Sequence, residues 1–442
     1  MFEKTNWKSG SKKKVLWRNA LVVKIVLMTC FFESFAIINS ESISINGRSG
    51  FGFQFSWFVG IILVTIVFIK KLNANNLKFY RSETGKFLWI YLMLSILDFT
   101  YVVLFEPQTE FYIYGEYYSV NFEVFLPRGM VHCIYILICG LIAIAVYEFL
   151  REKTGTETQL EIVKKYFVTI PFVFICIWGV YQWLTTYDLI PYIKIFNNNV
   201  STGFTYLRFK SSHRTSSVFP EPSEYGYFLG LYGPIVASFL LSEFNLFSIK
   251  QTRANKFWIA TLYISQCLLT GSFSLFCVIP IIFLISINQR HFKRQKRIMY
   301  NVLYVGGIAL LGGILYLVFA DRIVNILNGN DGSVLERFRM LLYGIELFKK
   351  LPIGGTGYGT FRAMDHISGT LAYGGIIGAS AFLFFLQKVG KISKKNPYAN
   401  MLYKGYLCFV AVGCAGNNLY EFLPFWLIPI LIESLCMNKS ER

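Results

Sequence analysis

A polar stretch near the middle of the chain, RTSSVFPEPSEYG, begins at Arg214 and combines a cation with a carboxylate. Prolines on both sides of Glu221 stiffen its backbone and push the residues before them out of helical geometry. Pro222 predicts the start of a helix whose first turn carries Ser223 and Glu224. Arginine can hold a phosphate or carboxylate by two parallel hydrogen bonds, so Arg214 is a candidate anion-binding residue and Glu221 a candidate general base. A helix cap with a local Arg214–Glu221 ion pair is the plainer interpretation.

A second stretch places two arginines on a predicted amphipathic helix. Ser333-Val-Leu-Glu336 is a capping-box pattern, which predicts a helix from Ser333 to about Lys350. Arg337 and Arg339 fall on opposite flanks of this helix, so we expect one to face a site and the other to face lipid headgroups. The apolar face of the helix is wide enough to lie on a membrane or on a helix bundle, and it comprises Val334, Phe338, Leu341, Ile345 and Phe348.

A glycine-rich run, PIGGTGYG, follows from Pro352. It lacks the Gly-Lys-Ser/Thr ending and the preceding strand of a phosphate-binding P-loop, which excludes that kind of site. Its glycines allow tight turns and close approach of the backbone, so Gly355, Gly357 and Tyr358 are candidates for binding a polar ligand. His366 stands just before an apolar run, where a lone histidine is more often structural than catalytic. We keep it as a candidate catalytic residue.

The elements that must position these residues are those of a membrane protein. Hydrophobic residues make up 54% of the 442 positions and charged residues 15%, whereas soluble domains carry about 25% charged residues. Apolar residues come in uncharged blocks of about twenty, the length of a transmembrane helix. We expect one integral membrane domain over residues 1–442, an all-α bundle of about twelve spans. They lie at about 19–39, 52–69, 87–105, 129–149, 166–184, 224–241, 257–271, 273–288, 300–320, 370–387, 402–416 and 422–436.

The net charge of +18 is located mainly in the short connectors between alternate apolar blocks. The positive-inside rule therefore puts these connectors, and both termini, in the cytoplasm. The connector 106–128 has four glutamates against one arginine and is expected outside. The basic N-terminal stretch leads into an apolar run with no small-residue cleavage site, which predicts an uncleaved first span. This distribution favours anionic lipid headgroups as the partner of the positive charge and argues against nucleic acid.

Two connectors on the outer side are long, at about 185–223 and 321–369, and we expect short amphipathic helices in them. Loops of this size usually carry function. Both hold basic residues that the positive-inside bias disfavours, which suggests an anionic ligand; the alternative is that long loops tolerate charge. The basic residues are Lys194, Arg208, Lys210, Arg214, Arg322, Arg337, Arg339, Lys349, Lys350 and Arg362.

The nine cysteines all fall in or beside apolar blocks and include no CxxC pair. They predict neither a disulfide framework nor a zinc site, and we expect no metal and no cofactor. Asp98 lies well inside a predicted span with no partner nearby in the sequence, and a carboxylate in that position is a candidate functional residue.

In their order, these motifs resemble those of the bacterial O-antigen polymerase and ligase family. In the first motif an arginine precedes Phe-x-Glu-Pro-Ser and a span, as Arg214 precedes Phe219-Pro-Glu-Pro-Ser223. In the second, an arginine stands about fifteen residues before Pro-x-x-Gly-x-Gly-x-Gly-x-Phe, and a histidine follows, here Arg337 and His366. The resemblance covers about residues 210–380 and the layout of spans. Leu341 and Ile367 depart from the residues usual in the family.

The resemblance implies a glycosyltransferase at the outer face of the cytoplasmic membrane that polymerises oligosaccharide repeat units linked to undecaprenyl diphosphate. The product would be O-antigen, capsule or exopolysaccharide. Arg214 and Arg337 would stabilise the departing diphosphate, with Arg339 as a second choice, and Glu221 would deprotonate the acceptor. His366 would orient the acceptor or assist the diphosphate. Ser223, Tyr225, Gly355, Gly357 and Tyr358 would contact substrate.

Two other functions remain open at this point. An O-antigen ligase would transfer the same donor to a lipid A core sugar. A transporter or flippase of lipid-linked glycan belongs to a different class, and it should show charged or broken-helix features near the bilayer midplane in repeated halves. The expected partners are lipid-linked substrates, the bilayer, and a chain-length regulator and flippase of the same pathway.

Overall fold

In a computed structural model of the chain, the structure describes residues 21–32, 53–74, 82–105, 122–151, 158–191, 213–241, 244–272, 332–360, 363–416 and 418–437, and short pieces elsewhere between 36 and 328. The regular secondary structure of this part of the chain is helical apart from three pairs of antiparallel strands of two or three residues: β1 (Ala36–Ile38) with β4 (Phe53–Gln54), β2 (Ser44–Ile45) with β3 (Arg48–Ser49), and β5 (Phe111–Ile113) with β6 (Glu116–Tyr118).

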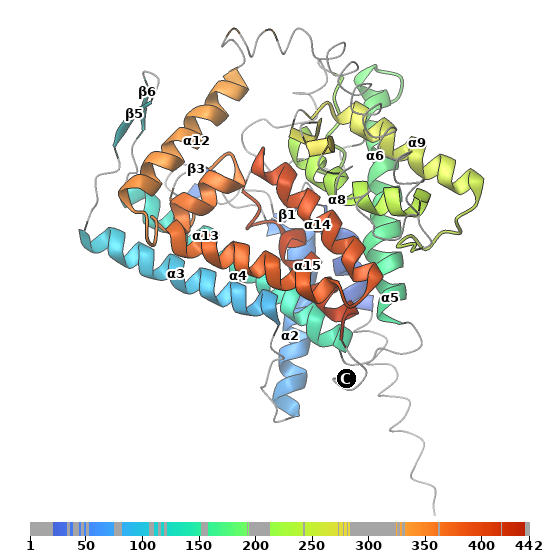
Figure 1. The fold of residues 1–442 in the computed structure, drawn as a ribbon, viewed down its shortest axis with the longest axis horizontal. Coiled ribbons are helices and arrows are strands. Elements are labelled where there is room, and N and C mark those ends of the chain that lie inside the picture. The colour runs from blue at the N-terminus through green and yellow to red at the C-terminus, as the bar shows by residue number, and fades with distance from the viewer. Residues whose placement is uncertain are drawn as a thin grey trace, which may run out of the picture.

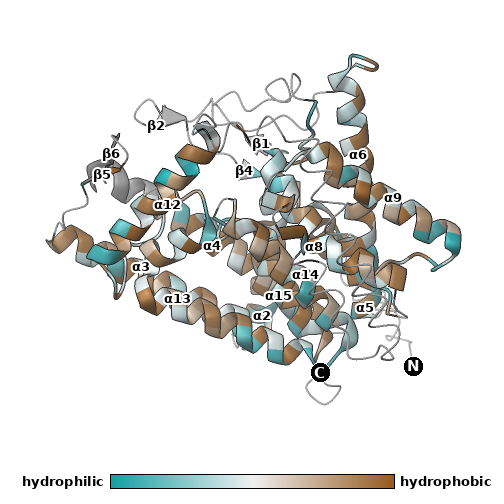
Figure 2. Ribbon diagram, turned by 45° about the horizontal axis from the view of Figure 1, so that its top comes forward, coloured by the Kyte–Doolittle hydropathy of each residue, from teal (hydrophilic) through white to brown (hydrophobic). Residues whose placement is uncertain are grey.

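Five helical stretches in the described part of the chain are long and apolar enough to cross a membrane. They are α2 (Phe55–Asn73), α3 (Glu83–Phe105), residues Gly129–Arg151 of α4 (Phe122–Arg151), the continuous run of α5 (Gln159–Ile162), η2 (Val163–Thr169, a π-helix) and α6 (Ile170–Thr186), and α13 (His366–Ser393). Large apolar side chains on their outer faces are exposed, for example Met93, Leu97 and Leu104 on α3 and Leu383 on α13. Apolar residues colour much of both helices in Figure 2. A lipid environment accounts for this exposure, whereas water would penalise it.

The other long helices are α8 (Pro222–Leu241), α9 (Arg253–Thr270), α12 (Gly332–Lys350), α14 (Pro397–Cys414) and α15 (Leu423–Leu435). Helices α8, α9, α14 and α15 coincide with predicted spans within a few residues. The predicted start of α8 at Pro222, with Glu224 in the first turn, is confirmed. The predicted spans at about 273–288 and 300–320, both chain termini and residues 194–212 of the first long loop lie largely or wholly outside the described residues.

The first predicted span, about 19–39, is wrong at its end. Residues 21–29 are helical, but Ala36–Ile38 form β1, which pairs with β4. The two isoleucines at the end of this run are β-branched, and such side chains favour extended backbone over helix. Apolar content alone does not distinguish the two conformations.

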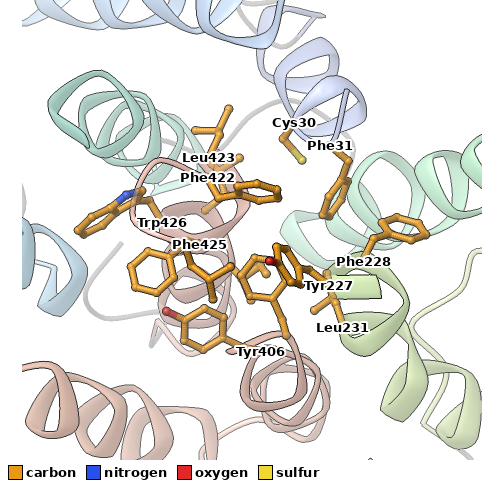
Figure 3. Close-up of a cluster of buried hydrophobic side chains, with 14 of the residues drawn as sticks. Cys30, Phe31, Tyr227, Phe228, Leu231, Tyr406, Phe422, Leu423, Phe425 and Trp426 are labelled. Carbon is orange, nitrogen blue, oxygen red and sulfur yellow. The ribbon is translucent and has the colours of Figure 1, made fainter. Parts of the chain in front are cut away.

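The core of the bundle lies where α8 meets α14 and α15, and Figure 3 shows its aromatic packing. Tyr227 of α8 packs with its ring edge against Phe422, with ring centroids 5.7 Å apart. Phe425 of α15 contacts Tyr406 of α14 at 5.9 Å. Phe31, just beyond the helical residues 21–29, meets Phe228 edge to face at 5.1 Å. Edge-to-face pairs of this kind add directional preference to apolar burial, so they fix how the helices are rotated.

Helix α12 lies across the upper left of Figure 1, beside α13 and the β5–β6 pair. It occupies the residues predicted to be helical, from Gly332 to Lys350. Met340, Tyr343 and Leu347 are buried, whereas Phe338 of the predicted apolar stripe is 44% exposed. Buried residues of this helix thus include some outside the predicted apolar face, and part of that face is exposed.

Helix α13 is broken inside its span at Gly375, whose φ of 56° and ψ of −155° are not helical. The glycine-rich run fills the break: Ile376 N–H and Ile377 N–H donate to the carbonyls of Pro352 and Ile353, at 2.8 and 3.2 Å. In return Thr356 N–H and Gly357 N–H donate to the carbonyls of residues 372 and 373, at 2.8 and 2.9 Å. Backbone groups freed by the break are therefore satisfied by protein, as an apolar environment requires.

Polar contacts fix the opposite end of the bundle, which the charge pattern assigns to the cytoplasm. Glu433 of α15 accepts hydrogen bonds from Glu83 N–H at 2.9 Å and Thr84 N–H at 3.0 Å, the first donors of α3. A carboxylate at a helix N-terminus satisfies donors that have no partner within the helix. Lys71 of α2 pairs with Glu148 of α4 at 2.9 Å, and both side chains are buried.

Candidate functional site

A short connection between α14 and α15, residues 415–422, gathers the polar groups of the second predicted stretch; we call it the α14–α15 turn. It lies at the end of the bundle where α8, α13 and α15 begin and α6, α9 and α14 end. The charge pattern assigns this end to the outside of the membrane, and we call it the outer end. Side chains from other elements bind the turn, among them those of Arg337, His366, Tyr358 and His132.

Arg337 is the first of these side chains. It extends from α12 and donates from Nη1 to the carbonyl oxygen of Ala415, at 3.0 Å. Ala415 caps the C-terminus of α14, where helix carbonyls lack intrahelical partners and partial negative charge accumulates. The contact therefore places a guanidinium at the outer end. Arg339 lies half-buried on the same helix.

His366 is the first residue of α13 and is buried. Its Nδ1 lies 3.3 Å from Asn418 Oδ1 and 3.4 Å from the amide nitrogen of Leu419, both in the α14–α15 turn. Asp365 caps the helix by accepting a hydrogen bond from Ser368 N–H at 2.7 Å. The ring also meets the ring of Tyr420 with centroids 4.7 Å apart. This surrounding fixes the imidazole tightly against the turn.

Tyr358 and His132 both contact Glu421, near the end of the turn. The Tyr358 hydroxyl donates to Oε1 of Glu421 at 3.2 Å, and Nδ1 of His132 contacts the same oxygen. His132 lies in α4, near the outer end of that span. Burial raises the pKa of Tyr358 well above its ordinary value, and the charge of Glu421 adds to the effect. Tyr358 therefore stays neutral and remains a hydrogen-bond donor.

The glycines of the run hold Tyr358 in this place. Gly355, Gly357 and Gly359 have φ values of 89°, 86° and 79°, a region that side chains other than hydrogen disfavour. A Cβ at Gly355 would lie 2.6 Å from the backbone of residue 373, and one at Gly357 would lie 2.6 Å from the Phe99 ring. Their close approach is to α13 and α3. The roles of Gly355, Gly357 and Tyr358 as substrate contacts stay predictions.

The first predicted stretch binds a different part of the outer end. Arg214 is half-buried and donates from Nε to the carbonyl of Thr270, the last residue of α9, at 3.1 Å. Gln182 of α6 accepts hydrogen bonds from Ser216 N–H and Ser217 N–H, at 2.8 and 2.7 Å. The stretch is thus held between the C-terminal ends of two helices.

Glu221 and Ser223 lie together at the start of α8, where Ser223 Oγ donates to Oε2 of Glu221 at 3.0 Å. Glu221 is half-buried. Tyr225 is fully buried and donates to Oε1 of Gln266 at 2.9 Å. The last contact ties α8 to α9, and a direct contact of Tyr225 with substrate stays a prediction.

Helix α8 connects the two groups. A Cβ at Gly416 in the α14–α15 turn would lie 2.2 Å from the hydroxyl of Tyr227, so the two are closely packed. Ser223 and Glu224 lie four and three residues before Tyr227 and share its side of the helix. The structure thus brings Arg337, Tyr358 and His366 together on the α14–α15 turn, and it holds Arg214 and Glu221 at the neighbouring ends of α8 and α9.

Sequence reasoning missed the residues of the turn and their partner on α4. Glu421, Asn418 and His132 stand in a short outer connector and at a span end, positions expected to need no polar side chain. Several polar residues in a connector of only a few positions were the available signal. Gln182, inside a span, gave a similar one.

Asp98 of α3 is buried and lies against the glycine-rich run: a Cβ at Gly354 would be 2.3 Å from its Oδ1. Within the described residues, its Oδ2 is buried and has no hydrogen-bond partner. In the same part of the chain no group of three His, Cys, Asp or Glu side chains is placed to hold a metal ion.

The chain matches no protein-family model, and no curated protein sequence matches it.

Proposed function

We propose that the protein is a membrane glycosyltransferase that polymerises oligosaccharide repeat units carried on a lipid diphosphate, at the outer face of the cytoplasmic membrane. The observation that supports this most is the α14–α15 turn. Arg337, His366 and Tyr358, all selected from the sequence for a diphosphate-sugar site, bind this one turn although they come from three separate elements.

The proposed reaction requires a group that stabilises negative charge and a group that accepts a proton. Transfer breaks the bond between the anomeric carbon and the diphosphate, which leaves with additional negative charge; arginines stabilise such charge without proton transfer. In the proposal Arg337 and Arg214 supply this stabilisation, with Arg339, two residues after Arg337 in α12, as the second choice. The acceptor hydroxyl must lose a proton, and Glu221 is the base that the sequence suggests.

The proposal is tested with purified protein in lipid vesicles and a defined lipid-linked repeat unit. We expect polymer and free lipid diphosphate, in the presence of a chelator as well. Arg337→Ala should lower kcat by about 100- to 1,000-fold, the usual cost of one transition-state donor. Lys349→Ala is the matched control, since Lys349 is an exposed cation on the same helix, paired with Glu346. Equal activity in wild type and Arg337→Ala would contradict the assignment.

A second function has a specific observation in its favour. The break in α13 at Gly375 and the buried Asp98 beside it are features of transporters, which bind substrate at discontinuous helices. A transporter or flippase of lipid-linked glycan would move the substrate without forming polymer. A deletion strain separates the functions by gel: single-repeat product indicates a lost polymerase, accumulated lipid-linked polymer a lost ligase, and absent outer product a lost flippase.

A further inference from the structure

A histidine and a glutamate from distant parts of the chain meet at the outer end. Nδ1 of His132 contacts Oε1 of Glu421 directly, and the two side chains are 22% and 33% exposed. The protein holds both side chains in contact, and each keeps part of its surface exposed. Neither residue belongs to the motifs from which the proposed function was derived.

The surroundings fix the orientation of the His132 ring. Gly359 lies against it, since a Cβ there would be 2.8 Å from His132 Cδ2, and its φ of 79° also requires glycine. The ring of Tyr135 stands edge-on to the imidazole, with centroids 6.1 Å apart at 85°. Tyr358 holds the carboxylate through its hydroxyl. Ring and carboxylate therefore share one fixed geometry.

This geometry is that of an oriented general base. A carboxylate in ion-pair contact with Nδ1 favours the tautomer that carries its proton there and leaves the lone pair on Nε2, and it stabilises an imidazolium that forms when Nε2 takes a proton. The same turn holds Arg337 through Ala415, six residues before Glu421. The α14–α15 turn thus contacts Arg337 at one end and His132 at the other.

We propose that His132, positioned by Glu421, is the general base that deprotonates the acceptor sugar hydroxyl; this rests on the proposed function. The acceptor oxygen forms a bond to the anomeric carbon, and the bond from that carbon to the diphosphate oxygen breaks. The electron pair leaves with the lipid diphosphate. The acceptor proton moves to Nε2 of His132 and then to water. In this assignment Glu421 is a positioning residue, and Glu221 does not take the proton.

The test uses the full chain in lipid vesicles with the lipid-linked repeat unit. His132→Ala should lower kcat by about 100- to 10,000-fold, the usual contribution of a general base, with KM for the donor changed only a few-fold. Added imidazole should restore part of the rate. His213→Ala is the matched control: His213 is exposed, also stands near the outer end and stacks on Tyr187, and its loss should leave kcat unchanged.

Glu421→Gln tests the positioning role. It should lower kcat with little change in KM, and the double variant His132→Ala/Glu421→Gln should not respond to imidazole, because no carboxylate orients the added base. A purely structural role of Glu421 would not abolish this rescue. If His132→Ala does not fold, His132→Gln takes its place in the kcat comparison.

A normal kcat in both His132 variants would overturn the proposal, and so would an equal loss in His213→Ala. Loss of turnover in Glu221→Gln together with normal turnover in His132→Gln would return the base to Glu221. Absence of polymer and of released lipid diphosphate with the wild-type protein would instead overturn the proposed function itself, whatever the variants do.

Discussion

Gln182 shows how one side chain in a span can set the position of a catalytic candidate. Its side-chain oxygen accepts hydrogen bonds from two consecutive buried amides, those of Ser216 and Ser217. Ser217 has a φ of 52° and donates from Oγ to the carbonyl of Ile175 at 2.6 Å. The segment next to Arg214 is therefore pinned to α6 by hydrogen bonds that no water can replace.

Gln182→Met should lower the free energy of unfolding by about 2–4 kcal/mol, because two buried N–H groups lose their acceptor while the side-chain length is kept. Thermal unfolding in detergent measures the change. Ile177→Met, on the exposed side of the same helix, is the control and should have little effect. Equal stability of both variants would show that Gln182 does not anchor the segment.

For individual residues, the sequence identified several candidates for the site but did not identify the residues that they contact. Arg337 and His366 were recognisable from motifs, but their partners stand 78 and 52 positions further along the chain. His132 and Glu421 had no motif around them. A contact between distant residues depends on how the helices pack, and the spacing of residues within one segment does not determine that packing.

The start of a helix can be predicted from its own residues, whereas a π-helix or a break inside a helix is harder to predict. Pro222 starts α8 because proline suits the first helical turn, and this was predictable. Pro171 has no N–H to give to the carbonyl of Phe167, and the Tyr232 hydroxyl of α8 donates to that carbonyl at 2.9 Å. Neither the π-helix next to it nor the break at Gly375 was predicted, and the amides beyond the break bond to residues more than twenty positions away in the sequence.

Gly375→Ala should destabilise the protein by at least about 1–3 kcal/mol, because the φ of 56° is strained for alanine. The added Cβ would also lie 2.4 Å from the carbonyl oxygen of Ile353. Gly374→Ala is the matched control: nothing lies within 4 Å of its Cβ, and alanine favours helix over glycine by about 1 kcal/mol. Thermal unfolding of the two neighbours should therefore shift in opposite directions. A shift in the same direction would contradict the break.

The molecule as a whole has exposed apolar side chains along its long helices and a cluster of polar contacts at its outer end. Composition and charge pattern were enough to predict a helical membrane bundle, and five described helices have the length and apolarity to span a membrane. They were not enough to identify the buried residues of α12, because Met340, Tyr343 and Leu347 lie outside the predicted apolar face. The twelve-span arrangement with cytoplasmic termini stays a prediction.

Cysteine labelling in intact cells tests that arrangement. Lys349→Cys on α12 should react with a membrane-impermeant maleimide added from outside, because it is exposed at the outer end. Lys394→Cys, exposed in the connection from α13 to α14, should react only after the membrane is opened. The reverse pattern would invert the topology and remove the proposed site from the outer face.

The contact between Glu433 and the start of α3 has a consequence for biosynthesis. The donors of α3 find their acceptor 350 residues later in the chain, so α3 enters the membrane long before the ribosome has made its cap. Until α15 arrives, two amides at the start of α3, the end that the charge pattern assigns to the cytoplasm, remain available to water or to a chaperone. A nascent chain halted before Glu433 would lack this acceptor, so both amides would stay without it in every unfinished copy.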